Sequence, residues 1–498
     1  MKIVSLRALF VGVTATLLAA CDCGGQLAGI AAEDAGAVGV RSPDAGPAAA
    51  DAGAAGEDAG ADGCAWSDRF GDRDLQSPTG LALAPDGTVV VTGSFFGSIA
   101  FGSQSWSAPS SSQRWTSNGA LPGRAFVAKL DAAGGTVWSR SLSNGIALDG
   151  PMVAVDPAGA VHLAAEFRDV VDITGVTLTP RDGVDALLAM LGADGQPLWS
   201  RQLSSFIPGG AITLAGFGVD AAGSAVVLGR RAPGQDFFLA KIDATGALVW
   251  SHLFPNSGCD SWNSRLEPLA VNAAGEIFLD VTPFGAGSCS FDFGGGPLTL
   301  SPRGDNTLLA RFDAAGRHLW SRRVDSLEAG APGIHFAGGR PALGAAGEAY
   351  AFGSFGGTID LGCGALTAAS ASGGTFVASF DGAGRCAWAR QFSPFGTAIT
   401  VLPAGNVLLS GTLEGEADFG TGSVGGQGRS IIGVELDPRG RTASAQVYGR
   451  GQAGLTALAV TGQGEVLLTG RLSGTARFCS RTLASEGSDD VFIAKLRR

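Results

Sequence analysis

The chain has 498 residues, 79 of them glycine, and a formal net charge of −11 at pH 7. Residues 22–63 carry −7 of that charge and the first 20 residues +2, which leaves −6 for residues 64–498. A charge this small argues against a nucleic-acid-binding surface. No stretch after the N-terminus has the apolar spacing of a long amphipathic helix.

The first 20 residues are predicted to be an export signal. Lys2 and Arg7 flank an apolar run, residues 8–20, that is too short to span a bilayer comfortably. The run ends Leu-Ala-Ala before Cys21, which resembles the signal box of bacterial lipoproteins. The resemblance implies cleavage before Cys21 and palmitate-type acylation of that cysteine, which anchors a protein stably to a membrane. The alternative is an ordinary signal peptide with an incidental cysteine.

Residues 21–63 are expected to be a disordered, acidic tether behind the lipidated cysteine. Asp-Ala-Gly triplets recur, and the segment has too little aliphatic bulk to fold. We expect anchoring to the outer membrane or the cell surface. Asp22 resembles the inner-membrane retention signal of some bacteria, so the inner membrane stays an alternative. Cys23 is expected to have no partner within the folded domain.

From residue 64 onward one phrase recurs, consisting of a strand such as Ala-Lys-Leu, an Asp-x-x-Gly turn and a Trp-Ser-Arg strand. The tryptophans of successive copies stand 61, 51, 70 and 68 residues apart, at Trp138, Trp199, Trp250, Trp320 and Trp388. This period predicts stacked or radially arranged units. Because the ring recurs in every copy, it is expected to be packing material rather than a ligand site. The neighbouring Lys and Arg are expected on solvated strand faces.

Each unit is predicted to hold four short β-strands. Two apolar runs flank an Asx-x-x-Gly turn, as in residues 153–165, and a variable connection leads to the third strand and the Trp-bearing fourth. Seven third strands can be counted, the last at 491–496. The predicted fold is all-β, a seven-bladed β-propeller of four-stranded blades over residues 64–498.

The strand that the last copy lacks stands at the other end of the predicted domain. Residues 64–70 have the Trp-Ser pattern of a fourth strand, with Trp66 in the repeated position. We therefore expect this N-terminal strand to complete the last blade, which closes the ring and removes an unpaired edge.

The repeat frame suggests three disulfides, although sequence alone cannot prove connectivity. Cys363 and Cys386 fall in one unit, and Cys64 and Cys479 occupy the equivalent places in the last. These are therefore expected to pair, which would covalently hold the closure. Cys259 and Cys289 remain as a third pair. No metal site is expected, because the chain has no Cys-x-x-Cys and only four scattered histidines.

Ligand-binding candidates lie where the repeat is interrupted. One Ser-rich connection, residues 103–123, carries Trp106, Arg114 and Trp115, and a later insertion carries Trp262. Exposed tryptophans in polar loops can stack on sugars or anchor a protein partner. The alternative is that they fold back as caps on the propeller.

The histidines give little support for catalysis. His252 occupies an Arg position of the repeat and His318 follows a turn, so both are expected to be surface substitutions. His162 alternates with apolar neighbours, which favours a structural polar group. No nucleophile elbow or phosphate loop stands out, and no cofactor is expected.

The blades resemble those of bacterial seven-bladed propeller proteins of the SBBP type. The resemblance is carried by Gly87–Phe95, by Asp292-Phe293-Gly294 and by the Phe-Val-Ala-Lys-Leu-Asp phrase, and it covers residues 64–498. It implies an exported or surface-anchored protein without a shared activity. Residues 243–250 also resemble the tryptophan-docking motif of quinoprotein dehydrogenases and of an outer-membrane assembly lipoprotein, in which Asp, Thr-Gly and Trp lock adjacent blades. Here the spacing is one residue shorter and Thr occurs once.

The function that the sequence favours is a membrane-anchored, non-catalytic envelope scaffold that binds a protein or glycan, with the propeller itself monomeric. An envelope or outer-membrane assembly factor is the second possibility. An exported enzyme, either a quinoprotein or a hydrolase, is the third. Assembly predicts a cross-linked protein partner, and an enzyme predicts bound metal or cofactor.

Overall fold

A computed structural model describes residues 64–111, 123–142, 144–147, 150–233, 236–255, 269–282, 290–300, 307–324, 327, 334–335, 341–368, 373–393, 395–396, 398–478 and 480–497. Contacts divide the chain into Met1–Ala52 and Gly53–Arg498, and every described residue belongs to the second unit. Apart from short 3₁₀ turns such as η2 (Leu203–Ser205), its regular structure is strand, so the all-β prediction is confirmed. The described part contains no helix that is long and apolar enough to cross a membrane.

Most strands form separate antiparallel sheets, each from one copy of the repeat. The first three sheets consist of four strands each: β2 (Gln76–Leu83), β3 (Val89–Phe95), β6 (Arg124–Leu130) and β7 (Thr136–Ser141); β8 (Met152–Val155), β9 (Val161–Phe167), β12 (Asp185–Leu191) and β13 (Pro197–Gln202); β14 (Ile212–Val219), β15 (Ala225–Arg231), β16 (Asp236–Ile242) and β17 (Leu248–Phe254). The next two consist of β18 (Ala270–Val271), β19 (Ile277–Val281), β22 (Thr307–Phe312) and β23 (His318–Val324); and β24 (Ile334–His335), β25 (Ala342–Leu343), β26 (Ala349–Phe355), β29 (Gly374–Phe380) and β30 (Cys386–Phe392).

Four of these sheets carry a small hairpin between their second and third long strands. The hairpins are β4 (Ser98–Phe101) with β5 (Gln104–Ser107), β10 (Val171–Asp172) with β11 (Thr177–Leu178), β20 (Ser290–Asp292) with β21 (Pro297–Thr299), and β27 (Thr358–Asp360) with β28 (Ala365–Thr367). In the third sheet, only residues 232–235 separate β15 from β16. That connection is too short for a hairpin.

The last two copies of the repeat are joined in one eight-stranded sheet. Its strands are β31 (Ala398–Val401), β32 (Val407–Asp418), β33 (Ser423–Leu436), β34 (Thr442–Val460), β35 (Val466–Phe478), β36 (Arg481–Ala484), β37 (Asp490–Leu496) and β1 (Cys64–Phe70). The 19-residue β34 explains the joining, because its first part pairs with β33 and its second part with β35. One long strand therefore ends one four-stranded unit and begins the next.

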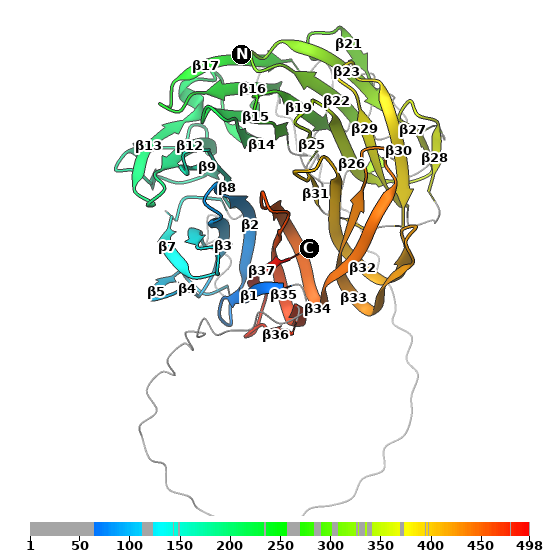
Figure 1. Cartoon of the computed structure of the whole chain (residues 1–498). Helices are drawn as coiled ribbons and strands as arrows, with labels where there is room; N and C mark the ends of the chain where they lie inside the picture. Colours follow the sequence, from blue (N-terminus) through cyan, green and yellow to red (C-terminus); the bar gives the residue numbers. More distant parts are fainter. Residues whose placement is uncertain are drawn as a thin grey trace, which may run out of the picture. The chain divides into compact units, whose positions relative to one another are not determined.

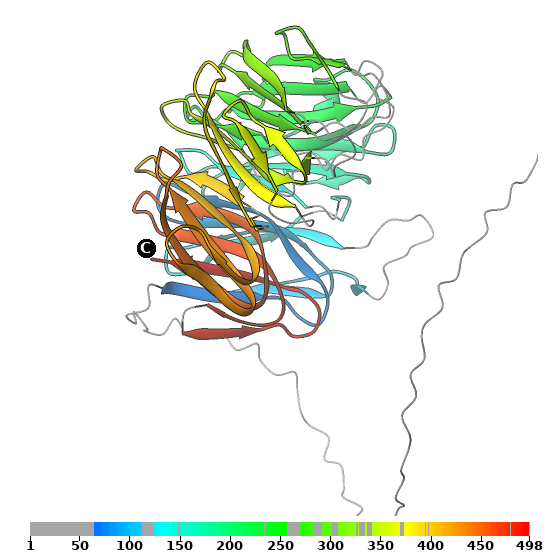
Figure 2. The same cartoon turned by 90° about the vertical axis from the view of Figure 1, so that its right-hand side faces the viewer.

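Successive units lie side by side through their first strands, in chain order (Figures 1 and 2). Strand β2 contacts β8, β8 contacts β14, β14 contacts β18, β18 contacts β25, β25 contacts β31, and β31 contacts β34, which also contacts β2. Four-stranded antiparallel units adjoining in this way constitute a β-propeller-like fold.

The N-terminal strand pairs as the repeat frame requires. Strand β1 lies antiparallel to β37, with Trp66 opposite Lys495 and Phe70 opposite Val491. The chain ends of the folded unit thus share one sheet, and β37 is not an open edge.

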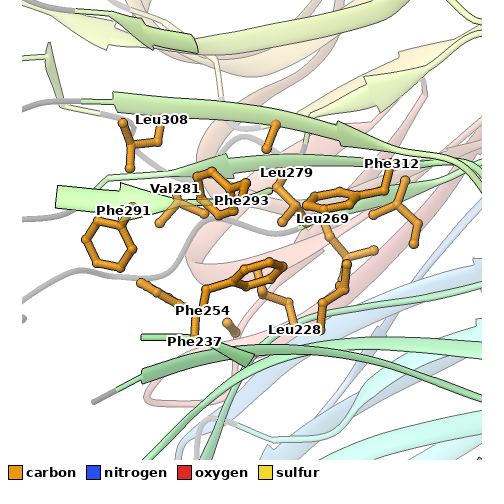
Figure 3. Close-up of a cluster of buried hydrophobic side chains, with 14 of the residues drawn as sticks. Leu228, Phe237, Phe254, Leu269, Leu279, Val281, Phe291, Phe293, Leu308 and Phe312 are labelled. Atoms are coloured by element: carbon orange, nitrogen blue, oxygen red, sulfur yellow. The ribbon is translucent and has the colours of Figure 1, made fainter. Parts of the chain in front are cut away.

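The core lies between the sheets. Figure 3 shows the cluster between the third and fourth sheets, where Phe237 and Phe254 face Phe291, Phe293 and Phe312. Phe291 and Phe293 come from the β20 hairpin and its turn, so the hairpin fills the outer part of the space between two sheets. Aromatic rings bury much apolar area in such a place because each contributes a large surface.

Candidate functional site

The repeated tryptophans join one sheet to the next. In five of them the indole N–H donates to the backbone carbonyl of the second residue in the turn between the third and fourth strands of the following sheet, whereas the Trp320 N–H has no partner among the described residues. The pairs are Trp66 with Ala132 (3.0 Å), Trp138 with Ala193 (3.1 Å), Trp199 with Ala244 (2.9 Å), Trp250 with Ala314 (3.4 Å) and Trp388 with Pro438 (3.0 Å). These bonds join neighbouring sheets through the repeated Trp and the turn that precedes the next Trp-bearing strand.

The turn glycine is needed for this contact. Gly195 has φ of 79°, a left-handed conformation that favours glycine. A Cβ atom there would lie 2.7 Å from the indole of Trp138, so the ring can pack against this turn only because Gly195 has no side chain. The Trp and the Asp-x-x-Gly turn of the sequence phrase are two halves of one inter-sheet joint.

The repeated lysines belong to the same joint, and their predicted place on solvated faces is wrong. Lys129, Lys241 and Lys495 are buried. Each ammonium donates to the very carbonyl that accepts the indole N–H of its own unit, at Ala193 (3.1 Å), Ala314 (3.3 Å) and Ala132 (3.4 Å) respectively. Each also pairs with a carboxylate of its own unit: the distances are 3.9 Å to Asp86, 2.7 Å to Asp220 and 2.8 Å to Glu465.

The repeat's arginines complete the joint in three sheets by donating to the turn glycine carbonyl of the following unit. The pairs are Arg201 with Gly246 (3.3 Å), Arg322 with Gly384 (2.7 Å) and Arg390 with Gly440 (2.9 Å). In the third sheet His252 takes this place. Its Nε2 lies against Gly316, where an added Cβ would be 2.6 Å away, but has no hydrogen-bond partner among the described residues. The shorter side chain leaves the joint incomplete.

A groove of about 780 Å³ opens at this place, between β17 and the fourth sheet. Its apolar lining includes Phe254, Phe293 and Phe312, which belong to the cluster in Figure 3. Its polar lining includes His252, His318, Asp292 and Arg317. An apolar lining with a few polar groups is typical of ligand sites.

His318 is the second departure from the repeat that faces the groove. It begins β23, at the frame position that Cys386 holds in β30, and its imidazole packs over Gly295. Its Nε2 is also buried without a partner among the described residues. Burial holds the pKa of His318 below its usual value, against the opposing charge of Asp292. Its neutral form can therefore offer a hydrogen bond to a ligand at neutral pH.

The two charged groups of the groove are already engaged. The Asp292 carboxylate accepts the N–H groups of Gly294 (2.7 Å) and Gly296 (3.0 Å). Arg317 forms an exposed ion pair with Asp313 at 2.7 Å. The groups left for a ligand are thus the two imidazoles and the aromatic lining. The described residues contain no cluster of three or more His, Cys, Asp or Glu suited to a metal ion.

The tryptophan predicted for ligand binding that the structure describes folds back onto the core. Trp106 lies on β5, packs against the cluster around Phe101, and donates its indole N–H to Ser139 Oγ at 2.9 Å. This geometry favours the cap rather than the ligand-binding alternative for Trp106. Arg114, Trp115 and Trp262 lie outside the described residues, as does Cys21.

The predicted pairing of Cys363 with Cys386 is confirmed, with a sequence separation of 23. Cys64 is disulfide-bonded as well. Its expected partner Cys479 and the pair Cys259 and Cys289 lie outside the described residues, so these two pairings stay predictions.

The groove histidines were not expected from the sequence to share a site. Two signals point to it in hindsight. His252 breaks an otherwise repeated Arg, and the interval from Trp199 to Trp250 is the shortest of the series, at 51 residues. The interval is short because the third sheet has no hairpin.

No protein-family model and no curated protein matches the chain. Solved structures to which it is similar include the polysaccharide lyase Uly1, with 10% identity, a TM-score of 0.44, and coverage of 84% of this chain and 89% of that one. An apocarotenoid oxygenase from Synechocystis follows with 10% identity, a TM-score of 0.39 and coverage of 86% and 93%. A quinoprotein-alcohol-dehydrogenase-like protein from Bacteroides thetaiotaomicron has 10% identity, a TM-score of 0.33 and coverage of 84% and 99%. With identities and TM-scores this low, none of the named activities transfers to this chain.

Proposed function

We propose that this chain is a membrane-anchored, non-catalytic binding scaffold of a bacterial cell envelope, and that the groove beside β17 is its binding site. The observation that carries the proposal is the pair His252 and His318. Both depart from the repeat, both line one groove, and both keep an Nε2 atom without a partner among the described residues. The buried lysines of the repeat and three of its arginines are instead engaged in joining sheets, which favours a structural role for them.

The scaffold is, in this proposal, a closed ring of seven SBBP-type blades. Its support is the pairing of β1 with β37 and the contact of β34 with both β31 and β2. The hydrogen bond from Trp66 to Ala132 adds a joint between the last and first units, equivalent to the joints between other units. A closed ring gives the groove rigid walls, which lowers the entropic cost of binding.

The anchor is, in this proposal, the acylated Cys21, with residues 22–63 as a tether to the outer membrane or cell surface. Its support is the Leu-Ala-Ala-Cys signal box and the acidic, Ala- and Gly-rich composition behind it. Metabolic labelling with a palmitate analogue should mark the wild-type chain and not a Cys21→Ala variant. Persistent labelling of that variant would contradict the anchor.

The binding role is tested with the full-length protein and a His252→Arg variant in envelope cross-linking and glycan-array experiments. The variant should fill the groove, because Arg at this frame position donates to the following turn glycine in three other sheets. We expect it to lose the bound protein or glycan while keeping its thermal stability. Leu198→Lys, a change at an exposed outer-strand residue that is not part of the groove lining, is the control. Ligand capture that His252→Arg leaves intact would refute the groove as the site.

A further inference from the structure

Strand β17 lacks the charge that other outer strands carry. Its sequence from Leu248 to Phe254 contains no Lys, Arg, Asp or Glu, whereas β7, β13, β23 and β30 each have Arg two residues after the Trp. After the His252 position, β17 has Leu253, where the other four have Ser, Gln or Arg. Leu253 is 40% exposed and Val249 53% exposed. Charged side chains on edge strands hinder pairing with other chains, and β17 has none.

The same strand is also uncovered. Ser139 and Ser200 follow the Trp in the first two sheets and are buried, at 4% and 2% exposure. Ser139 accepts the indole N–H of Trp106 from its hairpin, and Ser200 shares a 2.7 Å hydrogen bond with Thr174. The equivalent Ser251 on β17 is exposed, because its sheet has no hairpin. An open face therefore lies on one side of β17 and the groove on the other.

We propose that β17 is a docking edge for an extended segment of a partner protein, which adds to the third sheet as a fifth strand. β17 is the last strand of its sheet in the described part, so one row of its backbone N–H and C=O groups faces outward. Main-chain hydrogen bonds would supply affinity, and the pockets that receive alternate side chains would supply specificity. This inference rests on the proposed binding role and names the ligand class of the same groove.

The two faces of β17 define the chemistry of the added strand. Alternate side chains of the added strand would point toward the groove, which His252 and Phe254 line, and toward the open face at Ser251. The unpartnered imidazoles suit hydroxyl or amide side chains on the groove side. The exposed Val249 suits an apolar side chain on the other side, whereas Leu253 also borders the groove. Because β17 offers no countercharge, the fitting segment is uncharged and alternates polar with apolar residues.

Other occupants fit less well. A second copy pairing through its own β17 could not fill the groove, because its Trp250 already donates to Ala314 and its Phe254 is buried in its own core. The tether of residues 22–63 is rich in Gly and Asp, which are depleted from strands. The edge therefore points to a different protein.

The test uses the full-length protein in detergent and a phage-displayed library of random dodecapeptides. We expect recovery of uncharged peptides that alternate polar and apolar residues. Val249→Lys, which lies outside the groove lining, should weaken their binding by about tenfold or more, because it places a charge on the pairing edge. Leu198→Lys on β13 is the matched control and should bind as wild type. Hydrogen exchange of the complex should show new protection at β17 amides and none at β13.

Three outcomes would overturn the inference: no enriched peptides, enriched peptides whose affinity Val249→Lys leaves unchanged, or a concentration-dependent dimer that Val249→Lys dissociates. The dimer would assign the edge to a second copy. A ligand that is lost in His252→Arg yet unaffected by Val249→Lys would keep the proposed groove function and reject strand addition. Failure of both variants to change any binding would reject the groove as well.

Discussion

The indole N–H of Trp66 donates to the carbonyl of Ala132 at 3.0 Å, and this bond joins the strand that begins the folded unit to a turn of the first sheet. Strand β1 reaches that turn only because it pairs with β37, at the other end of the chain. Lys495, which stands opposite Trp66 in that pairing, donates to the same carbonyl at 3.4 Å. One backbone oxygen thus receives groups from both chain ends of the domain.

The hydrogen bond of the joint is tested by comparing Trp138→Phe with Trp320→Phe. The Trp138 indole N–H donates to Ala193, whereas that of Trp320 is buried without a partner among the described residues. Trp320 is the more buried ring, so lost area alone predicts a larger cost there. We expect the opposite order in the free energy of unfolding by urea. Losing a hydrogen bond costs about 1 kcal/mol, and removing an unsatisfied N–H offsets the loss of ring area. A larger cost for Trp320→Phe would contradict the bonding role.

The repeat made the strand order and the β1–β37 pairing predictable, because Trp66 carries the phrase that the last copy lacks. It did not reveal that Lys129 is buried. A charged residue in an apolar strand is ordinarily exposed, and its partners, Asp86 and the Ala193 carbonyl, come from other parts of the chain. The groove was hidden for a similar reason: His252 and His318 meet only when the third and fourth sheets adjoin.

The buried pair of Asp156 and His162 resembles the pair of Asp220 and Lys241 in the third sheet, but its basic residue lies on a different strand of the sheet. In the third sheet Val226 stands opposite Lys241, which pairs with Asp220. In the second sheet the base is on the other strand: His162 stands opposite Met190 and hydrogen-bonds Asp156 at 3.1 Å.

A double-mutant cycle at His162 and Met190 tests this exchange. His162→Val alone should destabilise by about 1–3 kcal/mol, since it leaves one oxygen of the buried Asp156 carboxylate without its partner. Adding Met190→Lys should recover most of that loss by restoring the arrangement seen with Lys241. Urea unfolding of both single variants and the double variant gives the coupling free energy. Additive effects would mean that the two positions are independent.

The same histidine makes stability depend on pH. Burial holds the pKa of His162 below its usual value of about 6.5, although Asp156 opposes the shift. As pH falls below about 6.5, His162 binds a proton in the unfolded chain but stays neutral in the folded protein. The free energy of unfolding therefore decreases toward acidic pH. Wild-type protein should therefore lose more thermal stability between neutral and mildly acidic pH than His162→Val does. Because the carboxylates titrate in both proteins, the difference between the two profiles is the quantity to measure. Parallel profiles would contradict this origin.

The contribution of the confirmed Cys363–Cys386 bridge to stability can be measured separately from that of the predicted Cys64–Cys479 bridge. Replacing both Cys363 and Cys386 by Ser should cost about 3 kcal/mol, since the bridge closes a loop of 23 residues in the unfolded chain. Cys64 is bonded too, so reductant should destabilise that double variant further, and non-reducing peptide mapping should link Cys64 to Cys479. Cys64→Ser in the same background should remove this extra effect, unless the third pair, Cys259 and Cys289, also contributes. If Cys64→Ser does not reduce the destabilisation by reductant, the third pair causes that destabilisation, and the closure bridge contributes nothing to stability.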